Sequence, residues 1–337
     1  METRKVQLSG GTTYTVSLPK AWAQEHGIDA GSVLSLHPNG DGSLLVETRM
    51  DRSAIKRTTT VDVATDSETI LRHRIRALHA VGFDTVTLVD TTGHSDTRRA
   101  VVENTLTELS GFELLSSTDT RLQLTNLIDA ENVDIRKSVL RLRLVMLAMH
   151  RDAIDAVLSD DTTLSERVIE RDNEADKLFA MVTRHFRRAL TDLHEVEKLD
   201  YGRDELFEYY YASRQFERVA DHAVKIARFA ADPDATVPPA FADRLESLAA
   251  SSRKVVDTAG DVILTNAGID AAHLALERRS RLSEDLTELD RDLYTHDDPG
   301  EAYVVGLLLD SIRRSAEYGA NIVGIAIQQT GRQNVAQ

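Results

Sequence analysis

The spacing of apolar positions changes twice along this chain and divides it into three parts. Up to residue 49, apolar residues alternate with polar ones in short runs, which is the period of half-buried β-strands. Gly10-Gly11 and the stretch 38–42 supply turn residues between the runs. Pro19 opens a short helical pattern that ends at Gly27. The predicted strands are residues 6–8, 13–18, 33–36 and 44–47.

The middle part, residues 50–127, alternates between strand and helix patterns. Ser67 is the predicted cap of a helix at 67–81, and a second helix begins at Asp96 or Thr97 and runs to residue 109. The predicted strands are residues 58–63, 85–89, 112–116 and 121–127. The order βαβαββ indicates a unit of α/β type. It contains neither Gly-x-Gly-x-x-Gly nor a Walker loop, so a structural spacer and a small-ligand sensor are both consistent with it.

From residue 129 onward the pattern has the period of α-helices. Pro238-Pro239 separates two triplets of predicted helices, at about residues 128–235 and 236–331. Short breaks between long helices are typical of bundles with antiparallel neighbours. The predicted helices are residues 130–158, 162–194, 203–231, 239–267, 269–295 and 300–330.

These patterns predict a mainly α protein with an α/β N-terminal part. The expected domains are residues 1–49, 50–127 and 128–331, the last with two three-helix repeats. Four short strands and one short helix are too few to bury a core, so the first domain is expected to form a homodimer that shares its sheet.

Composition narrows the class of protein. The 337 residues carry 55 Asp and Glu against 40 Lys and Arg, a net charge of −15, which is typical of a protein from a halophile. The chain has no cysteine, which excludes disulfides and thiolate metal sites. No apolar run approaches the roughly 20 residues of a membrane span, and residues 1–5 lack the apolar core of a signal peptide. A cytoplasmic protein is therefore expected.

Two predicted helices carry acid pairs four residues apart on an inward face. Asp172 and Asp176 lie on or beside the apolar stripe of one helix, and Glu217 and Asp221 share an apolar face of the next. An acid on such a stripe must be paired, protonated or bound to a metal. Four carboxylates would suit a divalent or iron-type metal ion. The alternative is a solvated acidic surface, which is common in so acidic a chain.

An internal repeat surrounds the second acid pair. Residues 216–227 read FERVADHAVKIA, and residues 312–323, 96 positions later, read IRRSAEYGANIV. The phrase Glu-Arg-x-Ala-Asp-x-Ala-x-x-Ile resembles the signature of PhoU, the phosphate uptake regulator family, and the resemblance extends over about residues 128–331. It implies two copies of a three-helix unit, carboxylates that hold metal, and docking on the ATPase subunit of a phosphate ABC transporter.

The second repeat departs from that pattern. Arg313 stands where Glu217 stands in the first repeat, and Asp221 is matched by Glu317. A cation at a ligand position disfavours metal binding, so we expect metal on the first repeat only, with an internal pair between Arg313 and an acid as the replacement on the second.

The first domain resembles the AbrB/MazE/SpoVT swapped-hairpin DNA-binding domains. The matching phrase is GGTTYxVSLPKxW at residues 10–22, followed by GIxxG at 27–31. Such a domain often precedes the helical part in archaeal PhoU-like regulators. Residues 1–57 carry seven Lys and Arg against six acids, whereas the rest is strongly acidic. The resemblance and the position of the cations indicate Arg4, Lys5, Thr12 and Lys20 as DNA-binding residues.

The sequence therefore predicts a phosphate uptake regulator that binds DNA, metal and a partner, and that is not an enzyme. Among histidines, only His273 follows an acid, Asp270, at the spacing of carboxylate bundles. His222 points away from Asp221 and is expected at the surface or at an interface. The alternatives are a signalling protein that docks on the transporter without binding DNA and, less favoured, a metalloenzyme of bundle type.

Overall fold

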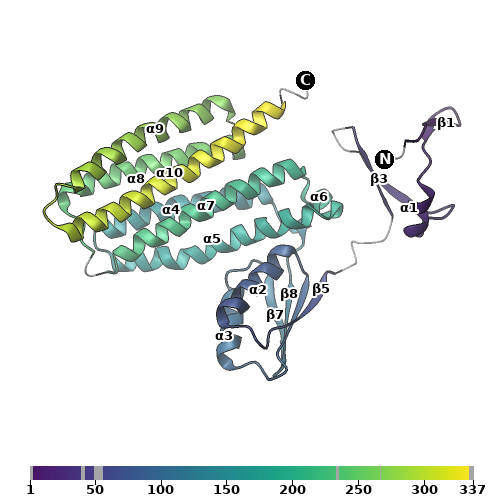
Figure 1. Cartoon of the computed structure of the whole chain (residues 1–337), viewed down its shortest axis with the longest axis horizontal. Coiled ribbons are helices and arrows are strands. Elements are labelled where there is room, and N and C mark those ends of the chain that lie inside the picture. Colours follow the sequence, from purple (N-terminus) through teal and green to yellow (C-terminus); the bar gives the residue numbers. More distant parts are fainter. Residues whose placement is uncertain (1–2, 39–41, 49–55, 233–234, 266, 334–337) are drawn as a thin grey trace. The chain divides into compact units, whose positions relative to one another are not determined.

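A computed structural model describes residues 3–38, 42–48, 56–232, 235–265 and 267–333, and side chains up to residue 328. The chain divides into two compact units, residues 1–56 and residues 57–337. The second unit holds two separate hydrophobic cores, one in an α/β domain and one in a helical bundle (Figure 1).

The N-terminal unit consists of two small hairpins and a short helix. Strand β1 (Gln7–Ser9) pairs with β2 (Thr13–Thr15), and β3 (Leu34–Pro38) pairs with β4 (Leu44–Thr48), both antiparallel. Helix α1 (Lys20–Glu25) follows Pro19 as predicted. Gly10 and Gly11 turn the first hairpin with φ of +64° and +79°, which favours glycine. No described residue of 3–38 or 42–47 is buried within this single chain.

The α/β domain confirms the predicted order of elements. Its sheet has the order β5-β6-β8-β7, with β5 and β6 parallel and the other neighbours antiparallel. Helices α2 and α3 pack on one face of the sheet (Figure 1), where their Leu71, Ile75 and Val102 share one hydrophobic core with Val86 and Leu124. The elements are β5 (Thr58–Asp62), α2 (Glu68–Val81), β6 (Thr85–Val89), α3 (Asp96–Leu106), β7 (Phe112–Ser117) and β8 (Arg121–Asn126).

The bundle consists of two triplets of long helices around one continuous core. Among the described residues, the first triplet is α4, α5 and α7, and the second is α8, α9 and α10 (Figure 1). The helices are α4 (Ile135–Leu158), α5 (Thr162–Ala189), α6 (Leu193–Leu199), α7 (Arg203–Phe229), α8 (Pro239–Thr265), α9 (Gly268–Leu293) and α10 (Pro299–Gln333).

Two predicted helix boundaries were wrong for local reasons. The first predicted helix was expected from residue 130, but residues 130–132 form a separate 3₁₀ turn, and α4 begins after Asp134, whose side chain accepts the Lys137 N–H. The predicted helix 162–194 stops at Ala189. Asp192 then accepts the His194 N–H and caps the short helix α6.

A buried arginine joins the two triplets, and a close helix approach packs α10 on α8 within the second triplet. Arg143 of α4 donates to Asp257 of α8 from Nε at 3.1 Å and to Asp261 at 2.8 Å. Gly260, between those acids, makes room for it: a Cβ there would lie 2.8 Å from the Arg143 Cδ. At Gly319 of α10, a Cβ would lie 3.0 Å from the Val256 backbone of α8. The repeats therefore form one packed body.

Candidate functional site

The predicted carboxylates lie on two adjacent helices of the first triplet. Asp172 and Asp176 come from α5, and Glu217 and Asp221 come from α7. All four side chains are half-buried, because their positions border the apolar faces with which α5 and α7 pack on each other. The four acids therefore lie on the inward-facing sides of their helices, as the helical period predicts.

Burial and mutual repulsion make three of these carboxyl groups hard to ionise. Burial, and then the Asp221 charge, raise the pKa of Glu217 to about 7 and the pKa of Asp172 to about 6. Burial, and then the Asp172 charge, raise the pKa of Asp176 to about 7. The pKa values of Asp172 and Asp176 are also raised by the charge of Asp221 on the other helix, and the pKa of Glu217 is also raised by the charge of Asp176. We call these four groups the carboxylate cluster.

Positively charged side chains compensate only part of the negative charge of the carboxylate cluster. Arg214, one turn before Glu217, pairs with it at 3.0 Å, which opposes the upward shift of the Glu217 pKa. Within the described part of the chain, Asp172, Asp176 and Asp221 have no ion-pair partner within 4.0 Å. The cluster therefore retains negative charge that a bound cation could neutralise.

The donor chemistry fits a hard cation, since every candidate ligand is a carboxylate oxygen. The spacing is less complete: among the described residues, no group of three or more His, Asp or Glu side chains stands close enough to hold a metal ion. A metal would have to draw the carboxylates of the two helices together.

The α/β domain also contributes to this region, which sequence reasoning missed. The charges of Arg76 of α2 and of Glu108, just after α3, act on the pKa of Asp176 in opposite directions. Arg76 itself pairs with Glu108 through Nε at 2.9 Å. No local signal in the sequence could reveal these residues, because they lie about 70 to 100 positions from Asp176 and reach it only through the docking of α2 on α5.

The corresponding place in the second triplet has a different arrangement. Glu317 pairs with Arg314 at 3.3 Å, and the same Arg314 lies 3.9 Å from Asp310. The expected internal pair of Arg313 was wrong: Arg313 makes no ion pair with any described residue, and Arg314 pairs with both acids instead.

His222 is buried between α7 and α10. It is 7% exposed, and its ring lies 5.8 Å from that of Tyr318. The expected surface position was wrong, because α10 covers this face of α7. Burial, and then the Lys225 charge, lower the pKa of His222 to about 4, so the ring is neutral at pH 7.

The predicted DNA-binding residues are all exposed on the N-terminal unit. Arg4 and Lys5 precede β1, Thr12 lies in the turn between β1 and β2, and Lys20 is the first residue of α1. The turn and the helix start therefore present them to solvent, as a DNA contact requires.

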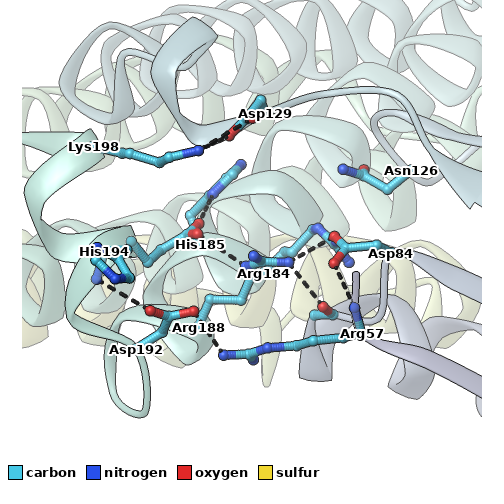
Figure 2. A network of polar contacts seen from close by, with 12 residues as sticks. Arg57, Asp84, Asn126, Asp129, Arg184, His185, Arg188, Asp192, His194 and Lys198 are labelled. Carbon is cyan, nitrogen blue, oxygen red and sulfur yellow. Dashed lines mark hydrogen bonds and ion pairs between the residues drawn. The ribbon is translucent and has the colours of Figure 1, made fainter. Parts of the chain in front are cut away.

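A network of polar contacts connects the α/β domain to the first triplet (Figure 2). Arg184 of α5 donates to the carbonyls of His79 and Phe83 at 3.0 and 2.9 Å and to Asp84 at 3.0 Å. Arg188, one turn later, donates to Asp84 at 2.7 Å. The α/β domain is therefore held on α5 by specific hydrogen bonds.

Comparison with known families assigns two parts of the chain. Residues 139–230, which span α4 to α7, match the PhoU domain family. Residues 7–53 match the family described as antidote-toxin recognition MazE, bacterial antitoxin. The chain is thus similar to the PhoU domain family over part of its bundle and to the MazE family over its N-terminal unit.

Two solved structures resemble the fold. PhoU from Pseudomonas aeruginosa is 20% identical with a TM-score of 0.49, over 59% of this chain and 96% of its own. The phosphate transport system regulatory protein PhoU from Streptococcus pneumoniae is 15% identical with a TM-score of 0.45, over 57% and 91%. No curated protein matches the sequence. In the described part of the chain, no helix has the length and apolar character needed to span a membrane.

Proposed function

We propose that this protein is a regulator of phosphate uptake that binds DNA as a dimer and acts by binding rather than by catalysis. The observation that carries the proposal is the presence of a MazE-type domain and a PhoU domain on one chain. The MazE-type domain would bind DNA, and the PhoU domain would couple that binding to phosphate transport. A solved structure that resembles the bundle is itself named a phosphate transport system regulatory protein.

Unburied apolar surface in the N-terminal unit supports the dimer. Leu8, Tyr14, Val33 and Leu36 are each more than half exposed, although strands normally bury one face. Two unpaired hairpins are too small to be stable alone. A second copy that shares the sheet would cover these side chains and form the missing core.

DNA binding follows from the exposed cations of this unit. A dimer would present Arg4, Lys5 and Lys20 twice, which would concentrate positive charge on an otherwise acidic protein. The test is fluorescence anisotropy with the full chain and a fragment of its own promoter, against scrambled DNA. We expect tighter binding to the promoter fragment. Equal binding to both would contradict recognition of the promoter sequence. No binding to either would favour the alternative in which the first domain only dimerises and the protein signals through its partner.

Metal binding by the first triplet is the second part of the proposal. Asp172, Asp176, Glu217 and Asp221 would hold a divalent or iron-type ion, whose charge would relieve the repulsion that raises three of their pKa values. We expect Asp221→Asn to lower bound metal sharply in elemental analysis. Glu317→Gln, the matched change in the second triplet, should leave it unchanged. Equal loss in both variants would refute the asymmetry.

The partner proposed for the bundle is the ATPase subunit of a phosphate ABC transporter. A pull-down with that subunit, using the full chain, tests the interaction. If the full chain and the Asp221→Asn variant both retain the ATPase subunit, the docking surface lies away from the carboxylate cluster. Loss in the variant alone would make docking depend on the bound metal, and no retention of the full chain would contradict the partner.

A further inference from the structure

A cavity of about 230 Å³ lies where the α/β domain meets the first triplet. Its wall is formed by both domains: α2 and the end of α3 on one side, and α5 and α7 on the other. The lining residues that bear on its chemistry are Arg76, His79, Glu108, Asp176, Thr183 and Glu217.

The charges of the cavity are not balanced. Both arginines of the wall already have carboxylate partners, since Arg76 bonds to Glu108 and Arg214 bonds to Glu217 at 3.0 and 3.1 Å. Asp176 is left without an ion-pair partner within the described residues. The ionised form of Asp176 is therefore uncompensated, and a bound molecule that stabilised it would carry positive charge.

Two buried polar atoms of the lining residues also lack partners. His79 is 1% exposed, and its Nε2 lies 3.1 Å from the Ser110 carbonyl, so Nε2 carries the proton of this hydrogen bond. Burial, and then the Arg184 charge, lower the pKa of His79 to about 3, so the ring is neutral and its Nδ1 is an acceptor. Neither this Nδ1 nor the Thr183 Oγ1 has a partner among the described residues. A buried acceptor without a donor is costly.

The rest of the wall is apolar. Ala80, Leu109, Phe179 and Ala180 line the same cavity. A hydrated metal ion gains little binding free energy from contact with an apolar surface. The carbon atoms of an organic molecule would bury apolar area against it, which favours binding.

We propose that this cavity binds a small organic cation, whose ammonium or guanidinium group donates hydrogen bonds to Asp176 and to the acceptors of His79 and Thr183. The short carbon part of the ligand lies against the apolar wall. Because the wall belongs to two domains, the bound cation ties the α/β domain to the bundle, and the domain acts as a ligand sensor rather than as a spacer. This proposal does not depend on DNA binding.

The test is isothermal titration calorimetry of the full chain with n-butylammonium, 1,4-diammoniobutane and guanidinium, at one fixed salt concentration and with EDTA throughout. Tetramethylammonium is the control ligand, because it has the charge but no N–H donor. We expect at least one of the three probes to bind about tenfold or more tightly than tetramethylammonium. Equal or absent binding of all four would overturn the proposal.

Substitutions inside and outside the cavity test whether the probe binds there. Asp176→Asn is expected to weaken binding of the best probe about tenfold or more, and Thr183→Val to weaken it several-fold, in line with the loss of a charged and a neutral hydrogen bond. Glu174→Gln is the matched control, since it removes one acid from the same helix outside the cavity. Asp221→Asn, which alters the proposed metal set but does not line the cavity, should keep probe affinity within about twofold. Equal losses in Asp176→Asn and Glu174→Gln would refute the site.

A second titration distinguishes binding of an organic cation from binding of a metal ion at the same acids. Without EDTA, Mg²⁺ or Mn²⁺ bound at the carboxylate cluster would use Asp176 as a ligand, so either ion is expected to weaken binding of the probe by competition. Binding of metal without EDTA, together with no binding of the organic probes in EDTA, would show that the acids serve a metal alone and would contradict the proposal.

Discussion

Arg184 donates a hydrogen bond to Asp84 over 3.0 Å from a side chain that is only 2% exposed (Figure 2). The two residues belong to different domains, since Arg184 is on α5 of the bundle and Asp84 lies between α2 and β6 of the α/β domain. Burial lowers the pKa of Arg184 to about 10, which still leaves it charged at pH 7. A charge this deeply buried is tolerated only when it is paired and hydrogen-bonded, so the junction of the two domains is a specific contact.

Removing this arginine should loosen the junction. Arg184→Met keeps much of the volume but leaves Asp84 and the His79 carbonyl each with one fewer partner and removes the Arg184 donor of the Phe83 carbonyl. We expect a loss of roughly 3 kcal/mol in the free energy of unfolding, measured by urea denaturation. Arg187→Ala, an exposed neighbour on the same helix, should change it by less than about 0.5 kcal/mol. Equal effects of the two changes would mean that the junction contributes no specific stability.

Gly82 should resist substitution for two reasons. It ends α2 with φ of +96°, and a Cβ there would lie 2.4 Å from the Arg188 Cγ. Gly82→Ala is therefore expected to destabilise the protein by about 1 to 3 kcal/mol in thermal unfolding followed by circular dichroism. Gly324→Ala, inside α10 with open space around it, should be neutral or stabilise by up to about 1 kcal/mol. The opposite order of stabilities would contradict the close approach at Gly82.

The carboxylate cluster should make stability fall as pH rises. The folded pKa values of Asp176 and Glu217 are about 7, above the ordinary 3.8 and 4.5, so between these limits the folded protein keeps protons that the unfolded chain has released. The stability that comes from protonation is present below the unfolded pKa and is lost as pH rises through the folded pKa. Urea unfolding from pH 4 to 8 in EDTA should show this slope.

Asp176→Asn is the matching variant. It should flatten that slope and make the protein more stable than the parent at pH 8, by on the order of 1 kcal/mol, because a half-buried charge is removed. Glu174→Gln, on the same helix, should leave the slope as it is. A slope that survives Asp176→Asn unchanged would show that other groups cause it.

The N-terminal dimer can be tested by placing one charged side chain on the apolar surface that the dimer would bury. Leu36 is 58% exposed in one copy, and burying an aspartate in its place in a dimer would be costly. We expect Leu36→Asp to convert the full chain from dimer to monomer in light scattering over a dilution series. Ala30→Asp, in an exposed turn of the same unit, should leave the mass unchanged. A parent protein that stays monomeric at every concentration would refute the shared sheet.

Local signals in the sequence predicted much of this fold. Ser67 caps α2 by accepting the Ile70 N–H, and the turn at Gly10-Gly11 and the helix after Pro19 stand where short-range chemistry places them. The six long helices were also predicted, because each has an apolar stripe of helical period. The end of α5 was missed, since the periodic pattern runs on into α6 and only the cap at Asp192 divides the two.

Long-range contacts could not be predicted in this way. Arg184 is a charged residue in a helical pattern and would ordinarily be placed at the surface, but the docking of the α/β domain buries it. The same docking brings Arg76 and His79 to a cavity that also contains Asp176. Spacing along one helix indicates which acids face inward, but it does not indicate which distant residues meet them.

The most direct test of the proposed function is the salt dependence of DNA binding by the full chain and by the triple variant Arg4→Ala, Lys5→Ala, Lys20→Ala. Each phosphate contact contributes about 0.9 to the slope of log K against log salt, so a dimer that loses six such contacts should lose about five. The matched control removes three exposed cations from α5, as Arg167→Ala, Lys177→Ala, Arg187→Ala. We predict weaker binding and a shallower slope for the first variant, with an unchanged dimer mass, and no change for the control. The same slope in all three proteins would contradict DNA binding through the N-terminal unit.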